Sequence, residues 1–97
     1  MARLKTTRWD ISDYLDSPER ISGYLEAAFE DGDPALIAAA LGDIARAKGM
    51  TDLARKAGLG RESLYKSLSA DGNPALSTVL QVLRALGLEL RAVPSGR

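Results

Sequence analysis

The chain has 97 residues with equal numbers of acidic and basic side chains, which suits one small domain with an appended segment. It contains no cysteine and no histidine, so disulfides and thiolate metal sites are excluded and the commonest acid–base catalyst is missing. No apolar run approaches the roughly 20 residues of a membrane span, and no apolar core follows the basic first residues. We expect a cytoplasmic protein with no signal peptide, no membrane contact and no cofactor.

Charge is divided unevenly along the chain. Residues 1–33 carry four basic and eight acidic side chains, a net charge of −4, whereas residues 34–97 carry nine basic and five acidic ones, a net charge of +4. The acidic part should avoid DNA and suits a basic protein, while the basic part could meet phosphate. Short chains also have uneven halves by chance, so charge alone does not decide between partners.

Residues 1–32 are predicted to form an acidic, aromatic N-terminal extension that is helical. Residues 1–8 have no apolar periodicity and should form a basic arm, and a short helix is expected over residues 9–15. The next helix should begin after Ser17, with a capping hydroxyl and a proline in the first turn, and should end at Gly32. Its apolar side chains follow the helical period and form one stripe, consisting of Ile21, Tyr24, Leu25, Ala28 and Phe29.

Four of the five aromatic side chains of the chain lie in this extension, namely Trp9, Tyr14, Tyr24 and Phe29. Two interpretations stay open. The aromatic side chains seal the extension against the rest of the protein, or they form a docking face for a partner, because large aromatic side chains are good interface anchors.

A third helix should begin at Asp33 and Pro34 and end at Gly49. Its expected inward face consists of Leu36, Ile37, Ala40, Leu41, Ile44 and Ala45. A last helix should begin with Ser77 as its N-cap and end at Gly87, after the turn-forming residues 69–75. Its expected inward side chains are Val79, Leu80, Leu83 and Leu86.

Residues 50–68 indicate two helices joined by a sharp turn. Thr51 is a good N-cap for the first helix, and Gly58 can end that helix in a left-handed conformation without steric cost. Leu59 then fills the corner. The second helix should begin at about Gly60, with apolar side chains inward at i, i+4 spacing, Leu64 and Leu68.

Residues 88–93 alternate apolar and charged side chains. A period of two predicts a strand, with Leu88, Leu90 and Ala92 on one face. A lone strand leaves its backbone groups unpaired, so it needs a partner. We therefore predict a homodimer in which this strand pairs antiparallel with the same strand of a second copy.

The two-helix stretch resembles the helix-turn-helix of phage-repressor-like proteins, on four positions. Ala54, Gly58, Leu59 and Leu64 stand where that motif has its small residue, its turn glycine and its core aliphatic side chains. The wider string of residues 40–90, with GRESLYKSL and DGNPALSTV, resembles the addiction-module antidotes, which are antitoxins with that DNA-binding fold. The resemblance implies an all-α, five-helix-type repressor-like domain over residues 33–97, with the N-terminal helical extension and the dimerisation strand.

The early residues of the second helix of such a motif enter the major groove of double-stranded DNA. Arg61 could bridge two acceptors of a guanine, Glu62 could accept from cytosine, and Lys66 could meet a phosphate. The full set of predicted DNA-contacting residues is Thr51, Gly60, Arg61, Glu62, Ser63, Tyr65, Lys66 and Asn73. Other interpretations are a solvated helix face for Arg61 and Lys66, an ion pair between Glu62 and Lys66, and a structural role for Tyr65 at the helix edge.

No enzyme is predicted, because no nucleophile has a histidine base and GLGRES lacks the lysine and the spacing of a phosphate loop. Three hypotheses remain: an antitoxin that represses its own operon, a stand-alone dimeric repressor, and a helical interaction module that does not bind DNA. The resemblance favours the antitoxin, since it includes the acidic extension. It implies operator DNA and a small basic RelE-type or HigB-type toxin, encoded by the neighbouring gene, as partners. The predicted toxin contacts are Trp9, Tyr14, Tyr24 and Phe29.

Overall fold

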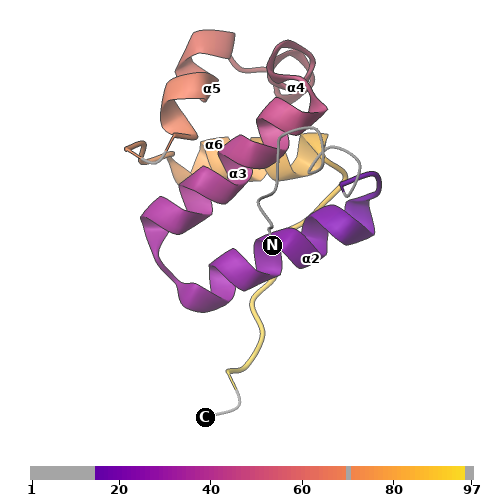
Figure 1. Ribbon diagram of the computed structural model, residues 1–97, viewed down its shortest axis with the longest axis vertical. Coiled ribbons are helices and arrows are strands. Elements are labelled where there is room, and N and C mark those ends of the chain that lie inside the picture. The colour runs from indigo at the N-terminus through magenta and orange to yellow at the C-terminus, as the bar shows by residue number, and fades with distance from the viewer. Residues whose placement is uncertain (1–14, 70, 96–97) are drawn as a thin grey trace, which may run out of the picture.

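The computed structural model describes residues 15–69 and 71–95, and this part of the chain contains helices and no strand (Figure 1). The helices are α2 (Pro18–Asp31), α3 (Pro34–Lys48), α4 (Met50–Ala57), α5 (Arg61–Ser67) and α6 (Leu76–Ala85). The predicted all-α class is confirmed for these residues. The arm and most of the short helix predicted before residue 15, including Trp9 and Tyr14, lie outside the described residues.

The first two described helices begin and end at the predicted residues. The Ser17 hydroxyl accepts a hydrogen bond from the backbone N–H of Arg20 (3.3 Å) at the start of α2, which caps one of the free donors of the first turn. The Asp33 carboxylate does the same for Ala35 (3.0 Å) at the start of α3. Between them Gly32 has φ +80°, a left-handed conformation that glycine adopts without strain.

Two predicted N-caps are wrong. Helix α4 begins at Met50 with Gly49 as its N-cap, so Thr51 lies inside the first turn and caps nothing. Met50 is buried, and including it in the helix places its side chain in the core. Helix α6 likewise begins at Leu76, after the extended residue Ala75, so Ser77 is inside the helix.

All five described helices contribute to one hydrophobic core. Helix α2 packs along α3, and α4 contacts α3, α5 and α6. Figure 1 shows α4 and α5 at one end of the molecule and α2 at the other. The largest side chains in the core with almost no exposed surface are Leu15, Ile21, Leu41, Ile44, Leu64, Leu68 and Val82.

Two leucines predicted to face inward are exposed. Leu80 is 38 % exposed because the buried stripe of α6 runs along the positions of Val79, Val82 and Leu83, and Leu80 lies at its edge. Leu36 is 44 % exposed in the first turn of α3, before the first buried residue of that helix, Ala38. The helical period of the apolar residues predicts these helices correctly. It places Leu36 and Leu80 on the inward face, however, and both lie beside the buried stripe of their helix.

The C-terminal segment, residues 88–95, has no regular secondary structure within the single chain. Its first residue is anchored, because the Leu88 N–H donates to the carbonyl of Leu83 (2.8 Å) and the Leu88 side chain packs against the core. Beyond it, Leu90 and Ala92 are exposed, and the segment passes α2 before it extends away from the helices (Figure 1). The predicted strand does not form within one chain, and its pairing with a second copy stays a prediction.

Candidate nucleic-acid interface

The turn between α4 and α5 has the geometry that its sequence predicts. Gly58 has φ +73°, and the N–H of Leu59 donates to the carbonyl of Ala54 (2.9 Å), which closes the end of α4. Ala54 of α4 and Leu64 of α5 are both buried in the same hydrophobic core. This corner sets the direction in which α5 leaves the core.

Two residues that the sequence analysis did not single out fix the position of the α4–α5 pair. A Cβ atom added to Gly42 would lie 2.0 Å from the carbonyl oxygen of Leu68, so α3 and the end of α5 approach each other closely. The Gln81 amide donates to the carbonyl of Ala57 (3.4 Å), which ties α6 to the end of α4. A glycine inside a helical pattern is a recognisable signal of close packing, whereas no pattern marks Gln81.

Helix α5 presents a continuous exposed face of polar and aromatic side chains. Leu64 is buried against the core, and the residues on the other side of the helix line one shallow cavity, namely Arg61, Glu62, Ser63, Tyr65 and Lys66. Five of the eight predicted DNA-contacting residues are therefore brought together. Tyr65 is 55 % exposed and lines the same cavity, so its ring is not packed into the protein.

The other three predicted residues are also exposed. Gly60 is the N-cap of α5, in an extended conformation, Thr51 is in the first turn of α4, and Asn73 is in the loop that follows α5. None of the three lines the shallow cavity on α5.

Charge on the two helices is arranged differently. On α4, the carboxylate of Asp52 pairs with Arg55 and with Lys56 (3.3 Å), which neutralises part of their charge. On α5, Arg61 and Lys66 form no ion pair with any described residue, and Glu62 does not bridge to Lys66. The two free cations of this pair of helices are therefore on α5, where a phosphate or a base edge could reach them.

A family model described as "Probable addiction module antidote protein" matches residues 5–94. The chain belongs to this family. A protein of Haemophilus influenzae described only as uncharacterized is 45 % identical over 87 residues, which covers 90 % of each chain. No solved structure matches the chain.

Membership of the antidote family implies an antitoxin role, with a toxin as partner and no enzymatic activity. No helix among the described residues is long and apolar enough to cross a membrane. The predicted resemblance to the addiction-module antidotes is confirmed at the level of the family. Its finer part, the phage-repressor-like motif, stays a prediction.

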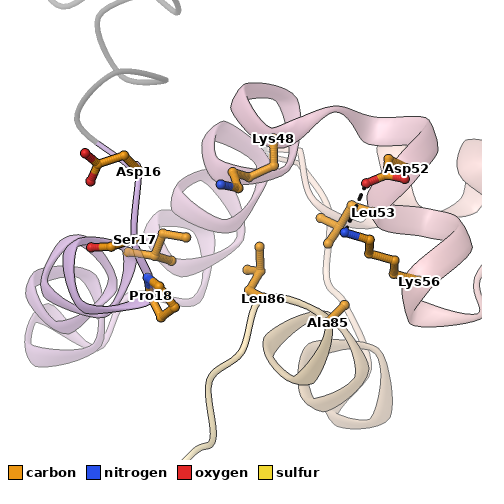
Figure 2. A pocket seen from close by; sticks show the side chains of 10 residues that line it. Asp16, Ser17, Pro18, Lys48, Asp52, Leu53, Lys56, Ala85 and Leu86 are labelled. Atoms are coloured by element: carbon orange, nitrogen blue, oxygen red, sulfur yellow. Dashed lines mark ion pairs between the residues drawn. The ribbon is translucent and has the colours of Figure 1, made fainter.

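A second hollow of this antidote-family chain, of about 140 Å³, lies where the start of α2 meets α3, α4 and α6 (Figure 2). Lys48 and Lys56 line it, but the Lys48 ammonium contacts the carbonyl of Leu15 (3.5 Å) and Lys56 pairs with Asp52. The described residues contain no group of three or more His, Cys, Asp or Glu side chains that could hold a metal ion. We interpret this hollow as a junction between helices.

The two described aromatic side chains of the predicted toxin-contact set lie in different surroundings. The Tyr24 hydroxyl donates to the carboxylate of Asp43 on α3 (3.1 Å), and Asp43 also pairs with Arg46 (3.1 Å). Burial, then the negative charge of Asp43 and this hydrogen bond, raise the pKa of Tyr24. Phe29 instead lines a groove beside the C-terminal segment. Tyr24 therefore connects α2 to α3, whereas part of Phe29 is open to a partner.

Proposed function

We propose that this protein is the antitoxin of a type II toxin–antitoxin module, and that it represses its own operon as a dimer. Its partners are operator DNA and a small basic toxin of the RelE or HigB type encoded by the neighbouring gene. The observation that carries the proposal is the match of nearly the whole chain to the antidote family. Charge and exposure of individual helices support the separate parts.

For DNA, the support is the exposed face of α5. In the proposed complex Arg61 and Glu62 contact base edges, Ser63 and Tyr65 contact the groove, and Lys66 meets a phosphate. Gly60 lets the start of the helix approach the duplex closely. Thr51 and Asn73 are exposed, and in the proposed complex they contact the DNA backbone.

For the toxin, the support is the acidic character of α2 and its flanks. Residues 15–33 contain six acidic side chains, all exposed, against one basic side chain, Arg20. Most of helix α2 lies at the end of the molecule away from α5, and only its start shares a hollow with α4 (Figure 1). Such a surface would steer a basic protein toward α2, because complementary charge mainly raises the rate of association. Trp9 and Tyr14, outside the described residues, are the proposed aromatic anchors.

Co-expression with the neighbouring open reading frame tests the proposal. We expect the neighbouring product to arrest growth alone, to be neutralised by this protein, and to co-purify with it. Gel shifts with DNA upstream of the operon test the repressor part separately. Specific DNA binding without any interaction with the neighbouring product would identify a stand-alone dimeric repressor instead.

A further inference from the structure

A groove of about 630 Å³ separates α2 from the C-terminal segment. One wall is a stripe of α2 at helical spacing, formed by Ser22, Leu25, Glu26, Phe29 and Glu30. The other wall comprises Leu88, Glu89, Leu90, Arg91 and Val93, and Leu83 of α6 also lines the groove. The groove thus has apolar side chains along its length and two carboxylates on the α2 side.

The C-terminal wall of the groove has unused binding capacity. After the anchored N–H of Leu88, no backbone N–H of residues 89–93 donates a hydrogen bond to any described residue. Leu90 and Val93 are 44 % and 78 % exposed. A row of free backbone donors beside exposed apolar side chains is a template for pairing with another extended chain.

The charges on the two walls allow an exchange of ion-pair partners. The α2 wall carries two carboxylates, Glu26 and Glu30, and the C-terminal wall carries one guanidinium, Arg91, beside the carboxylate of Glu89. Among the residues that the structure describes, Arg91 pairs only with Glu89 (3.4 Å), and both side chains are 77 % exposed, so this pair is weak and easily exchanged. A two-fold interface uses the same surface of both copies, so one surface must supply both a projecting part and the hollow that receives it. The C-terminal segment and the groove beside it meet this requirement.

We propose that the groove holds residues 90–93 of a second copy of this chain, so that α2 forms half of the dimer seam. Leu90 of each copy packs on the apolar side chains beside Phe29, and Arg91 faces Glu26 and Glu30. The dimensions agree: the α2 stripe from residue 22 to residue 30 spans about 12 Å, and four extended residues span about 13 Å. This assignment rests on the proposed dimer, and it gives Phe29 to the dimer seam instead of the toxin.

Charge reversal tests the occupant of the groove by sedimentation equilibrium on the full-length protein. We expect Glu26→Arg with Glu30→Arg to weaken the dimer by roughly tenfold or more, and Arg91→Glu to weaken it similarly. An equimolar mixture of the two variants should recover a dimer. In this mixed dimer the α2 wall of each chain faces a side chain of opposite charge at position 91 of the other chain. Glu19→Arg, an exposed carboxylate on α2 outside the groove, is the matched control and should leave the dimer unchanged. Circular dichroism melting of each variant establishes that it is folded.

Each result supports or overturns the assignment. A wild-type protein that is monomeric at every concentration overturns both the groove assignment and the dimer of the proposed function. A dimer that both groove variants leave intact overturns the groove assignment alone and places the seam elsewhere. Reversals that spare the dimer but abolish co-purification with the neighbouring toxin would show that the toxin binds in the groove. That result would also overturn the assignment of the groove to a second copy.

Discussion

At the scale of single residues, three positions connect the helices to one another. Tyr24 and Gly42 connect α3 to α2 and to the end of α5, and Gln81 connects α6 to α4. These contacts orient α5 without using any side chain of its exposed face. The polar face of α5 is therefore free to contact a partner.

Replacing Tyr24 with phenylalanine should cost about 0.5–1.5 kcal/mol at neutral pH, because the hydrogen bond to Asp43 is lost. The pKa of Tyr24 is raised in the folded state, so the unfolded chain ionises first as the pH rises through about 10. The stability that Tyr24 contributes is thus complete below pH 10 and is lost as the pH approaches the raised folded value. Urea unfolding from pH 7 to 11 measures this, and the difference between Tyr24→Phe and wild type should shrink over the last pH unit. A constant difference would contradict the assignment.

Replacing Gly42 with alanine should destabilise the protein by about 1–3 kcal/mol, because the added Cβ would collide with the carbonyl of Leu68. Gly23 is the matched control: it is also inside a helix, and an added Cβ would meet no atom within 4 Å. Gly23→Ala should stabilise the protein by about 0.5–1 kcal/mol, the ordinary helix preference of alanine. Equal effects of the two substitutions in thermal unfolding would show that the close approach at Gly42 is not tight in solution.

At the scale of elements, the sequence predicts the helices well because local signals are strong. Ser17, Asp33 and the prolines after them mark the starts of α2 and α3, and Gly32 and Gly58 mark two ends. Two predicted starts differ from the structure, because α4 begins at Met50 instead of after Thr51 and α6 begins at Leu76 instead of after Ser77. Burial of Met50 explains the first difference, whereas Leu76 is exposed and its inclusion in α6 is not explained by packing. The groove beside Phe29 could not be predicted at all, since it depends on where the C-terminal segment lies against α2.

On helix α5, recognition of a base and binding of a phosphate should depend on different side chains. Arg61→Ala should lose about 1–3 kcal/mol of discrimination at one operator position, because a guanidinium can bridge two acceptors of a guanine. Lys66→Ala should weaken specific and random DNA equally and make the salt dependence less steep by about one counterion. Gel shifts at two salt concentrations, with Arg55→Ala as a control cation already paired with Asp52, distinguish these effects. Uniform affinity for all DNA, unchanged by either substitution, would refute DNA reading by α5.

At the scale of the whole molecule, the predicted boundary at residue 33 falls in the tight turn between α2 and α3, yet the two parts share one core. Leu15, Ile21 and Leu25 are buried against residues of the other helices. Burying one such side chain contributes about 1.5–3 kcal/mol, so three of them together are comparable to the whole stability of a domain of this size. Residues 15–32 of the extension are thus part of the same folded body as the other helices.

Removing residues 1–32 should therefore unfold the protein, and loss of toxin neutralisation by that truncation would not locate the toxin site. Circular dichroism and a gel shift on residues 33–97 check this, and a folded fragment that binds DNA would instead establish residue 33 as a true domain boundary.

The toxin surface has to be tested with substitutions that leave the core intact. Glu19→Lys with Asp31→Lys changes two exposed carboxylates of α2 outside the groove. We expect this variant to melt and to bind DNA like wild type but to associate with the basic toxin more slowly, with the difference fading at high salt.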